Sequence, residues 1–94
     1  MKEIASLKKG NFFHNGSIIY KIIDNDTQKK VIKMIRYEIF IDARLKPRQM
    51  RLETKQRWSI SYHQLEKNVF FTTSVEIDKN TMQNLIMGVF GDII

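Results

Sequence analysis

The stretch from Gln49 to Tyr62 constrains the fold most, because its apolar and polar residues alternate. Successive side chains of a β-strand point to opposite faces, whereas a helix would spread them around its circumference. The stretch is therefore expected to be a strand with one apolar face and one wet face, although a second turn over residues 54–56 would split it. The apolar residues are Met50, Leu52, Trp58, Ile60 and Tyr62, and those of the wet face are Arg51, Glu53, Lys55, Arg57, Ser59 and Ser61.

Positive charge is concentrated in the same region. Residues 44–57 hold six cations and a single anion, Glu53, which accounts for +5 of the chain's formal net charge of +6. In this segment arginines outnumber lysines four to two, against one to nine elsewhere, and the planar guanidinium group suits phosphate or carboxylate recognition. The six cations are Arg44, Lys46, Arg48, Arg51, Lys55 and Arg57.

The first half of the chain is predicted to form hairpins. Asn15-Gly16 tolerates positive φ at both central positions of a type I′ turn, so residues 11–14 and 17–23 are expected to pair. Residues 24–28 supply side chains that bond their own backbone, which indicates a loop. In residues 31–43, both the odd and the even positions include apolar residues, which would also suit a buried helix. The β-branched residues and the match to a period of two favour a long strand.

The connection after this strand is expected at Arg44 to Arg48. Pro47 lacks an N–H and biases Lys46 toward extended geometry, which suits a loop between two antiparallel strands. The cations would then begin at the tip of a hairpin and continue along its returning strand. Lys8, Lys9, Lys29, Lys30, Lys33 and Arg36 would extend this positive surface if the sheet brought them near it, and are otherwise scattered solubilising charges.

The second half begins with a capping signal. Ser61 and Gln64 fit the S-x-x-Q capping box, which predicts one helical turn through Leu65, closed by residues 67–68. Residues 69–78 alternate and are predicted to form a core strand. Asn80 or Thr81 is then expected to cap an amphipathic C-terminal helix, whose apolar positions recur at helical spacing. These positions are Met82, Leu85, Ile86, Val89, Phe90 and Ile93.

Antiparallel strands followed by one helix indicate a single α+β domain over residues 1–94, with a small sheet or partial barrel packed against the C-terminal helix. The segment LKKGNFFHNGSIIYKII, residues 7–23, resembles the first hairpin of SH3-like small β-barrels. In both, a glycine, an aromatic pair, an Asn-Gly turn and a tyrosine-containing strand follow one another. The resemblance implies a fold and assigns no functional residue.

Composition narrows the function classes. The chain has no cysteine, which excludes disulfides, thiolate catalysis and Cys-ligated zinc. Apolar runs stay well below the roughly 20 residues that cross a bilayer, and the N-terminus lacks a signal peptide's hydrophobic region, so a cytoplasmic protein is expected. A pI near 9.7 favours polyanionic partners.

Catalytic and metal-binding signatures are absent from the sequence. His14 and His63 are the two histidines, and neither has a second ligand three or four residues away. No phosphate-binding glycine loop and no nucleophile motif occurs. We therefore expect a protein that is not an enzyme and binds neither metal nor cofactor.

The leading hypothesis is a small accessory protein that holds DNA or RNA through a cationic β-hairpin on the phosphate backbone. Arg44, Lys46, Arg48, Arg51, Lys55 and Arg57 are its candidate contacts; the simpler reading is a solvated face that protects an edge strand. The alternative is a protein-interaction module, an inhibitor or adaptor of phage or mobile-element origin, that docks on an acidic partner. The C-terminal helix could also form a homodimer.

Overall fold

The structure is a computed structural model that describes residues 3–42, 49–78 and 80–82, without the side chains of residues 40–42 and 49–52. Five antiparallel strands form one sheet in the order β4-β3-β2-β1-β5, which confirms the expected antiparallel sheet. Pairing of β4 with β5, which would close a barrel, does not occur in the described part, so the SH3-like fold stays a prediction. The strands are β1 (Phe12–Asn15), β2 (Ile18–Asp26), β3 (Val31–Asp42), β4 (Gln49–Ser61) and β5 (Val75–Ile77).

The β1–β2 hairpin is confirmed, with its turn one residue later than predicted. Asn15 pairs with Ile18, so the two turn residues are Gly16 and Ser17 rather than Asn15 and Gly16. Gly16 has φ +60°, and positive φ at the first turn position is what glycine supplies in a type II′ turn. Asn15 is held in β1, where its Nδ2 donates to the carbonyl of Phe70 at 3.0 Å.

The loop predicted at residues 24–28 starts later, because β2 continues through Asp26 after a bulge between Ile22 and Asp24. Oδ1 of Asp26 accepts hydrogen bonds from the backbone N–H groups of Gln28 and Lys29, at 3.2 and 3.0 Å. The side chain thus makes the predicted type of local bond at the end of the strand. β3 then runs over twelve residues, which confirms the strand rather than the helix for this segment.

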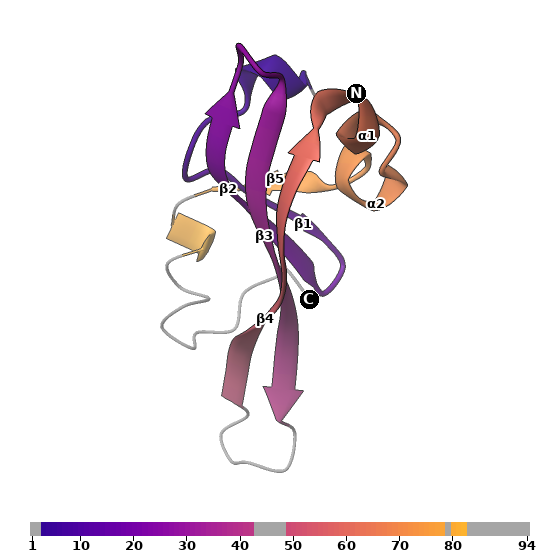
Figure 1. Ribbon diagram of the computed structural model, residues 1–94. Coiled ribbons are helices and arrows are strands. Elements are labelled where there is room, and N and C mark those ends of the chain that lie inside the picture. Colours follow the sequence, from indigo (N-terminus) through magenta and orange to yellow (C-terminus); the bar gives the residue numbers. More distant parts are fainter. Residues whose placement is uncertain (1–2, 43–48, 79, 83–94) are drawn as a thin grey trace.

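Short helical segments flank the sheet; those before β5 are η1 (Ile4–Ser6), α1 (Tyr62–Glu66) and α2 (Val69–Thr72). The Ser61 cap is confirmed, since its Oγ accepts from the N–H of Gln64 at 3.2 Å; Lys67 is the C-cap of α1. Figure 1 shows α1 and α2 side by side, directly after β4.

The prediction of a core strand over residues 69–78 is wrong for the first half of this segment. The Asn68 side chain accepts from the N–H of Phe71 at 3.1 Å and caps α2, so only Val75–Ile77 is strand. The helical turn buries Phe71 completely and leaves Val69 and Phe70 exposed. A local cap therefore prevails over the alternating pattern.

Two hydrophobic clusters lie on opposite faces of the sheet. The first is covered by η1, α1 and α2, and its centre is Phe71, whose ring packs edge-on against Phe13 and Tyr20 at centroid distances of 5.6 and 5.4 Å. Trp58, from the predicted apolar face of its strand, packs against this cluster, with its ring centroid 6.0 Å from that of Tyr20. The second cluster comprises Ile19, Ile39, Ile77 and Met82, with Phe12 and Tyr37 packed against it.

The chain after β5 begins a helical turn at residues 80–82. Its cap is Asp78, rather than the predicted Asn80 or Thr81: the Asp78 carboxylate accepts from the N–H and the hydroxyl of Thr81 at 2.8 and 2.9 Å. These bonds lower the pKa of Asp78 below its usual value. Met82 is buried, and the remainder of the predicted C-terminal helix, residues 83–94, lies outside the described residues.

Candidate nucleic-acid interface

The candidate interface is built on β4, which is one strand with a bulge and no second turn. Gln56 pairs with Arg36 and Thr54 pairs with Tyr37. Lys55 is therefore an extra residue of β4 that lies opposite no residue of β3 in the strand register. A bulge of this kind places two residues of one strand opposite one residue of its neighbour. Lys55 lies within residues 51–61, whose odd positions are predicted from the sequence to share one wet face.

The bulge changes which residues share a face. Glu53 lies opposite Glu38, and Arg57 lies opposite Ile35, which are an even and an odd position of β3. Because odd and even positions of a regular strand face opposite sides, Glu53 and Arg57 lie on different faces of the sheet. The prediction that all odd positions of residues 51–61 share one wet face is therefore wrong, since one inserted residue reverses the alternation.

Lys55 is neutralised by carboxylates. Its Nζ lies 3.1 Å from Oε2 of Glu53 and 3.8 Å from Oε2 of Glu38. Glu38 and Glu53 are direct cross-strand neighbours, and like charges in this position repel. Lys55 therefore offsets a local repulsion and is less available to a phosphate than the sequence suggested.

We call the β3–β4 segment over residues 40–51 the arm; its described parts are residues 40–42 of β3 and 49–51 of β4. Phe40 pairs with Arg51 and Asp42 with Gln49, whereas the pairing of β3 with β2 stops at Glu38. Figure 1 shows β3 and β4 continuing as a two-stranded projection past the other strands. Arg44, Lys46 and Arg48 lie outside the described residues, and so does the side chain of Arg51.

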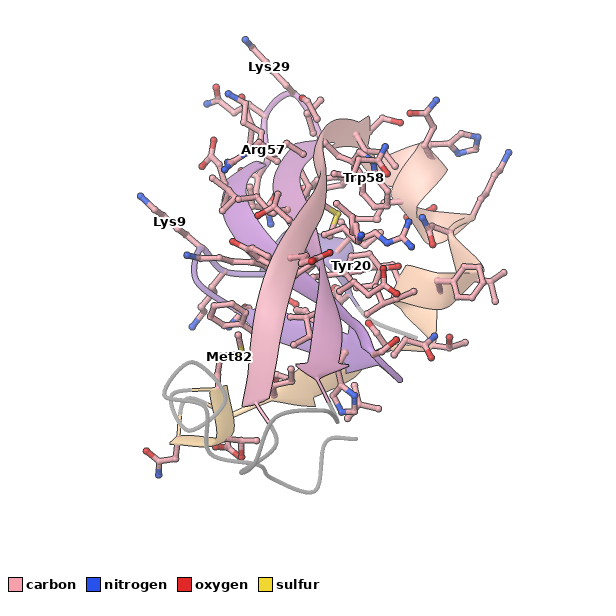
Figure 2. All side chains as sticks on the ribbon, turned by 90° about the horizontal axis from the view of Figure 1, so that it is seen from below. Lys9, Tyr20, Lys29, Arg57, Trp58 and Met82 are labelled. Atoms are coloured by element: carbon pink, nitrogen blue, oxygen red, sulfur yellow. The ribbon has the colours of Figure 1, made fainter. Side chains whose placement is uncertain are left out.

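Arg57 is exposed and lies on the face away from α1 and α2 (Figure 2). The sheet brings two lysines to the same face as Arg57: Lys33 of the adjacent strand β3, and Lys21 of β2, two strands away. Lys21 was not among the predicted contacts. Its position could not be read from the sequence, because its approach to Arg57 depends on the pairing of three strands. The sequence predicts Lys33 only as a possible extension of the basic surface and not as one of the six contacts.

Arg36, another candidate for that extension, points to the opposite face. It lies directly opposite Tyr20 and Gln56, and its buried Nε has no hydrogen-bond partner among the described residues. Burial raises the pKa of the Tyr20 hydroxyl above its usual value, and the nearby positive charge of Arg36 offsets part of that rise. Arg36 therefore belongs to the packed face and does not join Arg57.

A metal-ligand cluster and a membrane-spanning helix are both missing from residues 3–42, 49–78 and 80–82. No group of three or more His, Cys, Asp or Glu side chains is placed to hold a metal ion there. In the same ranges, no helix has the length and apolar character needed to cross a membrane. Comparison of the chain with protein-family models, curated proteins and solved structures finds no match.

Proposed function

We propose that this protein is a small cytoplasmic nucleic-acid-binding accessory protein that holds the phosphate backbone of DNA or RNA with its cationic β-hairpin. The observation that supports this is the arm. Because β3 and β4 stay paired beyond the last pairing of β3 with β2, the chain projects a two-stranded segment from the sheet. That segment and its connection contain Arg44, Lys46, Arg48 and Arg51 against one carboxylate, Asp42.

A two-stranded ribbon suits a polyanion because it can lie along or within a groove and present side chains to both backbones. Phosphate contacts position such a protein without reading sequence. Four contacts by the arm would contribute about −3.6 to the slope of log affinity against log salt on duplex DNA. We therefore expect binding with little sequence preference and strong salt dependence.

The test is fluorescence anisotropy with a random-sequence duplex and a single strand of equal length, over a series of salt concentrations. Replacement of Arg44, Lys46, Arg48 and Arg51 by glutamine should reduce the slope on duplex by about 3.6. Lys55→Gln is the control, because its ammonium is paired with Glu53 and Glu38 and should leave the slope nearly unchanged. Absence of binding by the unmodified protein at low salt would end the proposal.

A second candidate function is a protein-interaction module, the inhibitor or adaptor of phage or mobile-element origin. It is favoured by large apolar side chains exposed to solvent: Val69 at 68%, Phe70 at 64% and Val75 at 61%. An acidic partner could combine such contacts with the arginines of the arm. Under this proposal, Phe70→Ser abolishes capture of one defined partner after nuclease treatment, whereas nucleic-acid binding stays intact.

A further inference from the structure

The face of the sheet away from α1 and α2 carries basic side chains from three neighbouring strands. Arg57 of β4 lies directly opposite Ile35 of β3, and Ile35 lies directly opposite Lys21 of β2. Lys33 precedes Ile35 by two positions and therefore faces the same side. We call Lys21, Lys33 and Arg57 the cationic triad. It is distinct from the arm, since β3 and β4 contribute to it within the five-stranded part of the sheet.

The spacing of the triad residues suits contact with several phosphates of a nucleic-acid backbone. Neighbouring strands are about 4.8 Å apart, so the backbones of Arg57 and Lys21 are separated by roughly 10 Å, with Lys33 displaced by about 6.7 Å along β3. Duplex DNA carries one charge per roughly 1.7 Å of its axis. Several phosphates therefore lie within a span of this size.

The three charges are free to bind an anion. Arg57 and Lys33 are exposed, and Lys21 is half-buried. Among the described residues, the salt bridges are those of Lys55, and none involves the triad. Nζ of Lys21 lies 5.5 Å from the centroid of the Phe12 ring, an arrangement that orients the ammonium without neutralising it.

Two side chains of the triad, Arg57 and Lys21, flank a buried isoleucine. Ile35 is only 6% exposed, yet it belongs to neither hydrophobic cluster. Its direct neighbours across the sheet are Arg57 and Lys21, whose aliphatic stems can cover it while their charged ends stay in water. Such packing lowers the entropy that the two side chains lose when they bind.

Carboxylates limit the surface on one side. Asp24 lies directly opposite Lys33, and Oδ1 of Asp26 is used by the turn that follows β2. These two residues line a pocket of about 280 Å³ together with Lys29, Val31, Lys33 and Ser59. A polyanion is therefore favoured across the strands at the level of Arg57 and Lys21, with Lys33 at the edge of this surface, and is disfavoured beyond Lys33 toward the β2–β3 turn.

Among the described residues, the aromatic side chains on this face are Phe12 and Tyr37. The rings of Phe12 and Tyr37 pack against the second hydrophobic cluster. Base stacking on exposed aromatic rings contributes roughly 1–3 kcal/mol per base to the binding of single strands. Without it, contact at this face depends on charge, which is denser along a duplex than along a single strand.

We propose that the cationic triad is a second phosphate-binding surface, which contacts the backbone of the same nucleic acid as the arm and favours the duplex form. The inference rests on the proposed function and deepens it. The arm and the triad would hold the polyanion at separate points. Each surface would then contribute to the salt dependence of the affinity in proportion to its number of phosphate contacts.

The experiment compares two double variants that change the net charge equally. Lys33→Gln with Arg57→Gln should reduce the slope of log affinity against log salt on duplex by about 1.8, because two phosphate contacts are lost. The control is Lys55→Gln with Lys67→Gln, in which one lysine is already paired and the other ends α1 on the helix side. The control should keep nearly the full slope. Lys21→Gln added to the first variant should remove about 0.9 more.

Each outcome separates the two proposals. If the unmodified protein and the arm variant behave as proposed while Lys33→Gln/Arg57→Gln keeps the full slope, the second surface is refuted and the arm remains. Equal losses in the test and control variants would also refute it, since net charge alone would explain them. If the arm variant keeps the full slope, the proposed function of the arm fails instead. Thermal melts confirm that both double variants are folded.

Discussion

Glu38 and Glu53 face each other directly across β3 and β4, and one ammonium group, Nζ of Lys55, lies within 4 Å of both carboxylates. The lysine is the extra residue of the bulge, so the same irregularity creates the pair and its counterion. All three side chains are between one third and two fifths exposed, which places the cluster in solvent rather than in the core.

Lys55→Gln should lower the free energy of unfolding by about 0.5–1 kcal/mol at low ionic strength, because two opposed carboxylates lose their counterion. Salt screens exposed charges, so the loss should shrink in 0.5 M sodium chloride. Urea denaturation at the two ionic strengths measures this. Adding Glu38→Gln should restore most of the lost stability. A loss that is independent of salt would mean that Lys55 acts through packing and not through charge.

Phe70 and Phe71 are adjacent in sequence and opposite in environment, since Phe71 is fully buried and Phe70 is 64% exposed. Phe71→Ala should destabilise the fold by about 3–5 kcal/mol, because it removes the ring that packs on Phe13 and Tyr20 and leaves a cavity. Phe70→Ala, the matched control, should stay within about 0.5 kcal/mol of the original. Similar losses at the two positions would contradict the burial described for α2.

Asn25 joins the N-terminal segment to α1. Its Nδ2 donates to the carbonyls of Leu7 and Ile4 at 2.8 and 3.1 Å, and its Oδ1 accepts from the Tyr62 hydroxyl. We expect Asn25→Ala to cost about 2–3 kcal/mol and Tyr62→Phe about 1 kcal/mol. A double-mutant cycle should give a coupling of at least about 0.5 kcal/mol. Strict additivity would show that the two side chains do not interact.

Substitution of Gly16 tests the conformation of the turn in the β1–β2 hairpin. Its φ of +60° is strained for residues with a Cβ, while a Cβ placed there would meet no atom within 4 Å. Gly16→Ala should therefore lower stability by about 1 kcal/mol through backbone strain alone. Gly16→Asn should cost less, because asparagine tolerates positive φ. Ser17→Ala, in the same turn, is the control and should change the urea midpoint little.

Tyr20 should make the protein sensitive to alkali. Its pKa is raised in the folded state by burial, so this residue's contribution to stability is complete below the unfolded pKa of about 10. Above that pH the unfolded chain ionises first, and stability falls as the pH rises through the folded pKa. Tyr20→Phe should flatten the decline between pH 9 and pH 11, measured by urea midpoints. If the unmodified protein and Tyr20→Phe lose stability equally over this pH range, the loss comes from the lysines and not from Tyr20.

Features that depend on residues close in sequence were predictable. The alternation of residues 31–42 and 49–61 identified the two long strands, and Asn15-Gly16 located the first hairpin to within one residue. Ser61 and Gln64 identified the start of α1. In each case the decisive interaction spans two to four residues, so the amino-acid order contains the necessary information.

Tertiary structure decided which of these residues act together. The bulge at Lys55 exists because β4 must pair with β3 on both sides of it, and one inserted residue moved Arg57 to the face opposite Glu53. The packing of Phe71 on Phe13 and Tyr20 stabilises the helix over residues 69–72 that the local Asn68 cap begins, despite the alternation of these residues. Lys21 reaches the side of Arg57 only through the pairing of β2, β3 and β4. Strand register is set by contacts between distant segments, so a periodic pattern predicts a strand but does not determine which side chains its neighbours bring to the same face.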